Sequence, residues 1–94
     1  MLLTLSPQRS SDTLVLERYG DLLTFNGAAV NLGEIPEGGD GYDPEWTWII
    51  EPVTRVDGQL RVTISLPIGP DASDAALWPE PLTLTDDGPV SLPE

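Results

Sequence analysis

The sequence has 94 residues, nine of them glycine and ten proline, so it predicts one small, turn-rich domain (residues 1–94) with a modest hydrophobic core. It contains no cysteine, histidine or lysine, which excludes disulfides, thiolate and imidazole metal sites, Ser-His-Asp triads and Schiff-base chemistry. Sixteen acidic residues against four arginines set a formal net charge of −12, which disfavours contact with bare nucleic acid and anionic membranes and favours a basic partner or a cation.

The first residues, MLLTLSPQRSSD, do not combine a basic start with a sustained apolar run, so they do not predict a secretory signal. Nowhere does the chain approach the roughly 18 continuous apolar residues of a membrane span. We therefore expect a soluble protein that stays in the cytoplasm of the cell that makes it.

A three-stranded meander is predicted near the N-terminus. Residues 2–5 first form a separate short strand that Ser6-Pro7 ends, and residues 13–18 then begin the meander. Asn26-Gly27 is the strongest hairpin signal in the chain. Two-residue turns there and at Tyr19-Gly20 place the large apolar side chains on one face, with these opposing pairs: Leu14 with Phe25, Leu16 with Leu23, Phe25 with Ala28, and Leu23 with Val30.

Residues 33–45, GEIPEGGDGYDPE, separate the meander from the next strands. This stretch has four glycines, two prolines and five acids, too polar and too rich in breakers to form an element of its own. We expect a loop.

Residues 46–66 read as a long antiparallel hairpin with the best-defined apolar face in the chain. Its second arm alternates four apolar residues, Leu60, Val62, Ile64 and Leu66, with polar ones. A two-residue Asp57-Gly58 turn would place Glu51 opposite Ile64 on the buried side. We therefore predict a three-residue loop, Val56-Asp57-Gly58, with Gly58 left-handed and these opposing pairs: Thr54 with Leu60, Pro52 with Val62, Ile50 with Ile64, and Trp48 with Leu66.

The last third holds the one helical candidate, residues 71–78, with Asp71 as N-cap and Leu77 and Trp78 packed onto the sheet. A short strand at 82–85, a turn at 86–89 and a tail strand at 90–92 follow. The whole pattern predicts a mainly β fold: a small antiparallel twisted sheet, forming a barrel or a compact sandwich, with at most one short helix near 71–78.

The acidic loop is a candidate cation site, because hard cations such as calcium prefer clustered oxygen ligands. Its acids Asp40, Asp43 and Glu45 do not follow the EF-hand order, and Pro44 restricts the backbone, so a solvated loop is the favoured interpretation. Paired carboxylates can serve as general acid and base, but with sixteen acids some close pair is inevitable. We expect no enzyme activity, no cofactor and no bound metal.

Aromatic residues at the ends of predicted elements are candidates for a protein-binding patch. Tyr42, Trp46 and Trp78 stand beside acids, and such side chains either contact a partner or seal the end of a small core. Trp48 fits the core face instead. The candidate contact residues are therefore Tyr42, Trp46, Trp78, Asp40, Asp43 and Glu45.

Two long stretches, LLTLSPQRSSDTLVLERYGDLLTFNG and RVDGQLRVTISLPIGPDASDAALWPEPLTLTDDGPVSLP, are similar to small acidic proteins encoded among the tail genes of bacteriophages and prophages. The resemblance rests on the SPQR start, the DG-centred hairpin, Gly-Pro at 69–70, Pro-Glu-Pro at 79–81 and the DDGPV turn. It covers most of the chain, and residues 33–45 are its least characteristic part. No catalytic motif and no functional residue carries over.

The resemblance implies a phage-derived, non-enzymatic accessory or structural component of tail or tail-fibre assembly, in the host cytoplasm or in the virion. Its expected partner is a phage structural or assembly protein, for which a sheet edge offers a route through β-augmentation; nucleic acid and membranes are not expected partners. The alternative is an acidic inhibitor or DNA mimic that binds a basic host protein. Its acids cluster in loops, whereas a mimic needs a regular row near the duplex spacing of about 1.7 Å per charge.

Overall fold

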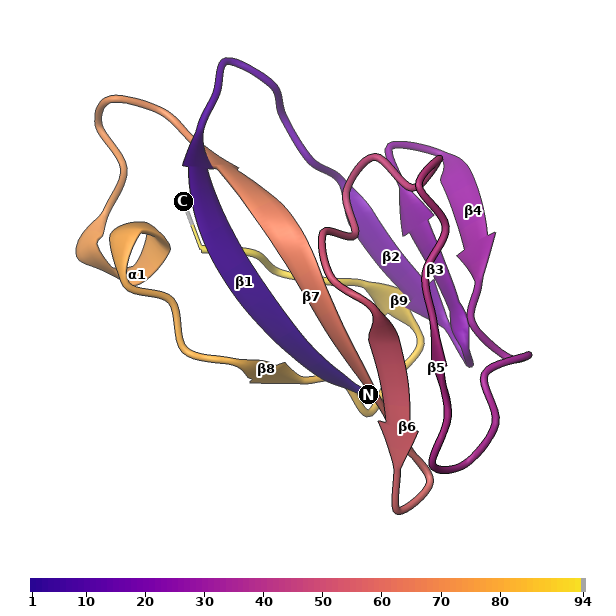
Figure 1. The fold of residues 1–94 in the computed structure, drawn as a ribbon. Coiled ribbons are helices and arrows are strands. Elements are labelled where there is room, and N and C mark those ends of the chain that lie inside the picture. Colours follow the sequence, from indigo (N-terminus) through magenta and orange to yellow (C-terminus); the bar gives the residue numbers. More distant parts are fainter. Residues whose placement is uncertain (94) are drawn as a thin grey trace.

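The computed structural model describes residues 1–93 and arranges them in two β-sheets that pack face to face (Figure 1). One sheet has the strand order β5-β6-β7-β1-β8 and the other β4-β3-β2-β9, so the fold is mainly β and a sandwich. The elements are β1 (Leu2–Arg9), β2 (Leu16–Tyr19), β3 (Leu22–Phe25), β4 (Ala28–Asn31), β5 (Asp40–Gly41), β6 (Val53–Val56), β7 (Gln59–Ile68), α1 (Asp74–Leu77), β8 (Leu82–Thr83) and β9 (Gly88–Pro89).

The two longest strands, β1 and β7, pair in parallel at the centre of the larger sheet, from Leu2 opposite Arg61 to Arg9 opposite Ile68. Every other strand pairing in residues 1–93 is antiparallel. The parallel pair was not predicted, because its strands lie more than 50 residues apart and no local turn signal connects them.

Pro7 in β1 and Pro67 in β7 both stand at positions where a backbone N–H would point away from the other strand of this parallel pair. Ser10 N–H donates to the Ile68 carbonyl (3.1 Å), so alternate residues of β1 face β7 and Pro7 faces the other way. Pro67 turns its backbone away from β1, just past the bond from Ser65 N–H to the Trp48 carbonyl (2.8 Å). We predicted that Ser6-Pro7 ends the first strand and that the hairpin stops at Leu66, but both strands continue because neither Pro7 nor Pro67 removes a bond between them.

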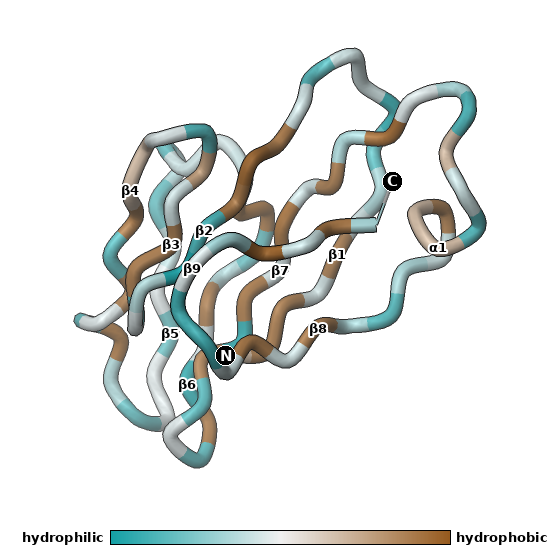
Figure 2. Tube along the Cα trace, turned by 180° about the vertical axis from the view of Figure 1, so that it is seen from behind, coloured by the Kyte–Doolittle hydropathy of each residue, from teal (hydrophilic) through white to brown (hydrophobic). Residues whose placement is uncertain are grey.

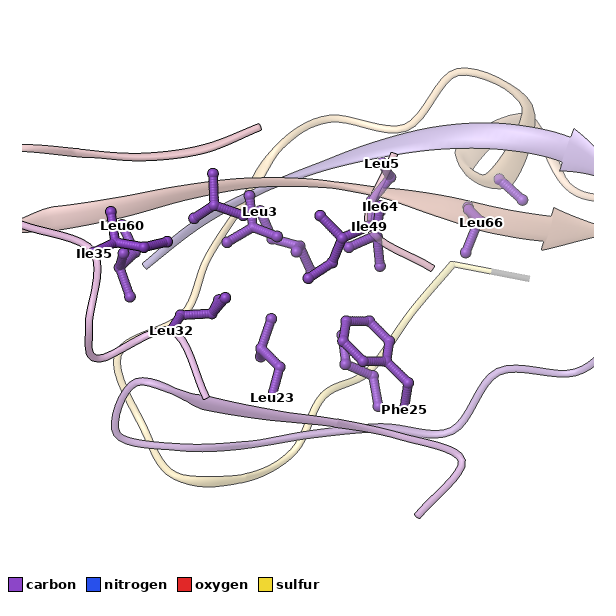
Figure 3. Close-up of a cluster of buried hydrophobic side chains, with 14 of the residues drawn as sticks. Leu3, Leu5, Leu23, Phe25, Leu32, Ile35, Ile49, Leu60, Ile64 and Leu66 are labelled. Carbon is purple, nitrogen blue, oxygen red and sulfur yellow. The ribbon is translucent and has the colours of Figure 1, made fainter. Parts of the chain in front are cut away.

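The core lies between the sheets, where side chains from both layers point toward one another (Figure 3). The predicted apolar face of β7 is confirmed, since Leu60, Val62, Ile64 and Leu66 are all at most 2% exposed. Leu23 and Phe25 of β3 face it from the smaller sheet. Figure 2 shows hydrophobic residues along β1 and β7 and hydrophilic residues gathered in the connections.

The turn between β6 and β7 differs from the prediction. It is the two-residue turn Asp57–Gly58, with both residues at positive φ (53° and 77°), and Thr54 lies opposite Arg61. The expected cost of this register does not arise, because Ile49 rather than Glu51 bridges Ile64. Five steps separate Ile49 from Thr54 but only three separate Arg61 from Ile64, so the first arm bulges outward by two residues.

The two-residue turn reverses the predicted faces of the first arm, because it shifts the register by one residue, and the two-residue bulge leaves this alternation unchanged. Ile49 and Val53 are buried, whereas Ile50 and Pro52, which we placed on the core face, are exposed. Glu51 lies in the bulge and is exposed as well, which removes the need to bury a carboxylate.

The predicted meander is confirmed, with a different first turn. That turn is Gly20–Asp21, with Gly20 at φ +62°, so Leu16 rather than Leu14 lies opposite Phe25. The shift of two residues keeps the apolar face intact because side chains alternate with period two. The Asn26–Gly27 turn and the pairs that it predicted, Phe25 with Ala28 and Leu23 with Val30, are confirmed.

The stretch 33–45 is more ordered than the predicted loop. It contains β5, which pairs with β6, and it buries Ile35 in the core. Arg55 holds the stretch in place, since its Nε donates to the Ile35 carbonyl (2.7 Å) and its guanidinium pairs with Asp21 (3.2 Å). The high glycine content led us to predict a loop. The contacts that hold the stretch could not be seen in the local sequence, because their partners lie on distant strands.

Helix α1 begins one residue after Ser73, whose hydroxyl accepts a hydrogen bond from the Ala76 N–H (3.3 Å), so Ser73 and not Asp71 is the N-cap. Ala76 is its buried residue. We expected Leu77 and Trp78 to pack on the sheet, but they are 37% and 82% exposed, because the single turn directs its small residue inward. Among residues 1–93 no helix has the length and apolarity to cross a membrane.

The C-terminal segment connects the two layers. Strand β8 pairs with β1 in the larger sheet, and β9 pairs with β2 in the smaller sheet. The predicted strand at 82–85 is shortened to two residues, and β9 lies inside the segment 86–89 that we predicted to be a turn. Residues 90–92 do not form the predicted tail strand, although Val90 N–H bonds to the Leu16 carbonyl (2.9 Å).

Two adjacent isoleucines test the observed register. We expect Ile49→Ala to lower the free energy of unfolding by about 2–4 kcal/mol, because it leaves a cavity in the core. Ile50→Ala should cost less than about 1 kcal/mol, because Ile50 is 40% exposed. Urea unfolding followed by circular dichroism measures both, and a larger loss at Ile50 would favour the three-residue loop.

Candidate functional site

A tight turn at residues 43–46 organises the candidate contact residues. Trp46 N–H donates to the Asp43 carbonyl (3.0 Å), and Pro44 occupies the second position, where its fixed φ suits a β-turn. The Asp43 carboxylate accepts a further bond from the Glu45 N–H (2.9 Å). The carbonyl oxygen and one carboxylate oxygen of Asp43 therefore both stabilise the turn.

Two aromatic rings pack at this turn. The rings of Tyr42 and Trp46 meet edge to face, with centroids 6.1 Å apart and an interplanar angle of 76°. Tyr42 is 52% exposed, whereas Trp46 is partly buried and packs against the core. Tyr42 thus limits the positions open to the Trp46 ring.

A hollow of about 380 Å³ lies between this segment and strand β4, and we call it the edge cleft. Strand β4 is the last strand of the smaller sheet, at the border of the sandwich (Figure 1). The lining residues come from the Phe25–Asn31 hairpin and from the 43–49 segment: Phe25, Ala28, Ala29, Val30, Asn31, Asp43, Glu45, Trp46, Thr47, Trp48 and Ile49.

The structure brings together four of the six predicted contact residues. Asp43, Glu45 and Trp46 line the edge cleft, and Tyr42 lies beside them against Trp46. Asp40 belongs to β5, opposite Thr54, and does not line the cleft. Trp78 follows α1, which lies on the far side of the molecule from β4 (Figure 1).

Sequence reasoning missed the other wall of the edge cleft. Ala28, Ala29 and Asn31 carry no chemical motif, and they matter here only because β4 ends the sheet. Trp48, assigned to the core, is partly buried and also lines the cleft. The Asn26-Gly27 signal located β4, but only the three-dimensional structure shows that the segment 43–49 lies opposite it.

Two further hollows lie elsewhere. One of about 800 Å³ surrounds the exposed Trp78 together with Asp74, Glu80 and Leu82. The other, of about 550 Å³, lies between the 10–14 connection and the segment that follows β7. Neither borders strand β4.

Two arginines pair with acids that stand next to strand ends in the sequence. Arg18 lies 3.9 Å from Asp87, and the Arg55–Asp21 pair lies near it in the fold. Burial, and then the neighbouring Arg18, lowers the pKa of the Met1 amine. A hydrogen bond to Glu17 raises the pKa of the exposed Tyr19 phenol. In the part of the chain that the structure describes, no three acids lie close enough to hold a metal ion.

The chain matches no family model, no curated protein and no solved structure.

The two tryptophans Trp48 and Trp78 provide a matched test of these environments. We expect Trp48→Ala to lower the free energy of unfolding by about 2 kcal/mol or more, because the indole packs against the core. Trp78→Ala should change it by less than about 0.5 kcal/mol, since its ring is 82% exposed. Denaturant unfolding of the two variants gives the comparison, and equal losses would show that Trp78 packs on the sheet after all.

Proposed function

We propose that the protein is a non-enzymatic, phage- or prophage-derived accessory or structural component of tail or tail-fibre assembly that acts by protein contact. The observation that carries the proposal is the edge cleft, where aromatic and acidic side chains meet an outer strand of a sheet. The resemblance of the sequence to small acidic proteins of phage tail gene clusters supplies the biological setting.

The edge cleft has the composition of a contact surface. Tyr and Trp are the side chains most often found at the centre of protein interfaces, because they offer a large apolar area with little conformational freedom to lose. Here Tyr42 and Trp46 already support each other, so less ordering remains to be done on binding. Binding would take place in the host cytoplasm during assembly, with the protein released or retained in the virion.

A second candidate function is supported by the charge. An acidic inhibitor or DNA mimic that binds a basic host protein would use the net charge of −12, and no acidic side chain is buried among residues 1–93. Such a surface attracts cationic partners over a distance, and salt weakens the attraction. The two functions therefore predict different salt dependence.

A pull-down from infected or prophage-induced cells, with the tagged full-length protein at low and at high salt, tests the proposal. We expect a tail or tail-fibre protein to remain bound at high salt, because a partly apolar interface survives screening. Trp46→Ala should reduce the recovery, while Trp78→Ala serves as the matched aromatic control outside the edge cleft. Recovery of a host DNA-binding protein that high salt releases would reject the assembly role and support the mimic.

A further inference from the structure

The outer strands of the two sheets are not equally protected. Strands β5, β8 and β9 have two residues each, and β9 includes Pro89. Strand β4 has four residues, Ala-Ala-Val-Asn, with neither a charge nor a proline. Short length, charge and proline are the usual means by which proteins prevent an edge from pairing with another chain. The sheets therefore leave one edge suited to accept a strand.

Alternate residues of β4 direct their backbone groups toward this edge. Leu32 N–H donates to the Asp21 carbonyl (2.9 Å), which continues the series Ala28, Val30 and Leu32 that faces β3. Ala29 and Asn31 consequently face outward. Within residues 1–93, no strand lies on that outer side to accept or donate backbone hydrogen bonds to these two residues. An added strand would find two donors and two acceptors there.

The edge cleft determines which side chains an added strand would carry. Ala28 and Ala29 are small enough for a second backbone to approach. On the facing wall, Trp46 and Trp48 offer indole surface, and Asp43 and Glu45 offer carboxylates. None of the chain's four arginines is among the described residues that line the cleft, so its charge is negative. Arginine fits this wall, since its stem packs on an indole and its guanidinium pairs with a carboxylate.

We propose that β4 binds an extended, arginine-containing segment of a partner protein as a fifth strand of the smaller sheet. The added backbone pairs with Ala29 and Asn31, and alternate side chains enter the edge cleft, with arginine next to Asp43 or Glu45. This inference rests on the proposed function and names the chemistry of its partner.

A second copy of the chain is a poorer occupant of the same edge. Pairing β4 with β4 would bring two molecules of net charge −12 together, with Asp43 and Glu45 of each beside the shared edge. Charge repulsion therefore favours a basic segment over self-association. Sedimentation of the protein at high salt, where repulsion is screened, checks this choice, and dimers that Ala29→Pro abolishes would overturn it.

Selection from a displayed library of random peptides of about nine residues tests the proposal with the intact protein as bait. We expect enriched peptides to carry arginine or lysine and apolar residues at positions two apart. Glu45→Arg and Trp46→Ala should each weaken binding of an enriched peptide by about tenfold, and Trp78→Ala should leave it unchanged. Failure to enrich any peptide, or enrichment without basic residues, would overturn the proposal.

Backbone pairing is tested separately on the best enriched peptide. N-methylation of the residues that face β4 should abolish binding, whereas N-methylation of the alternate residues should be tolerated, because only the former removes donors from the ladder. Ala29→Pro should also abolish binding of the unmodified peptide. The N–H of Ala29 points outward, so its loss removes a bond to the added strand and spares the bonds to β3. Equal effects of both peptides would show binding by charge alone and reject the added strand.

The pull-down described above separates this inference from the proposed function. A tail protein that both wild type and Ala29→Pro retain equally would leave the assembly role standing and reject β4 as the contact. Loss of the tail protein with Ala29→Pro, at an unchanged melting temperature, would support both. Recovery of no tail protein, together with selection of the expected peptides, would reject the assembly role and leave the β4 site standing.

Discussion

The parallel pairing of β1 with β7 is the contact on which the rest of the structure depends. It aligns eight residues of each strand and places β7 between β6 and β1, with alternate side chains of both strands in the core. Strand β1 in turn provides the edge on which β8 pairs, and from there the chain crosses to β9 in the other sheet. The N-terminal strand, the central hairpin and the C-terminal segment thus meet at one pair of strands. Because this pair closes a loop of more than 50 residues, its hydrogen bonds and its buried leucines must offset the chain entropy that closing the loop costs.

The fold leaves the side of the sandwich beside β4 uncovered. The larger sheet ends there in the two-residue β5 and the irregular arm that leads to Ile49, and the smaller sheet ends in β4. Since neither sheet crosses the gap, the edge cleft remains between them. The bulge between Ile50 and β6 contributes directly, because it places Ile49 rather than Glu51 opposite Ile64, with Trp46 and Trp48 at the border of the core. The same bulge therefore affects both the packing of Ile49 in the core and the shape of the edge cleft.

Charge and packing have separate roles in this protein. Only apolar residues are buried among residues 1–93, so the acids impose no desolvation cost on the core. Arg55 and Arg18 are largely covered and pair with Asp21 and Asp87, where they help to join loops to strands. The remaining negative charge faces solvent, where repulsion between like charges opposes self-association at the unprotected sheet edge. The same charge would favour a basic partner at that edge.

Local patterns in the sequence determined the β class, the apolar face of β7, the Asn26–Gly27 turn and the meander, because alternation and turn chemistry act over a few residues. They also placed Tyr42, Asp43, Glu45 and Trp46 together, since one short turn holds these residues. Only the tertiary structure decided the parallel pair, the inward side of Ile49, the exposure of Trp78 and the position of β4 beside the acidic turn. These features depend on which distant strands bury the most apolar surface together, and no short stretch of sequence contains that information.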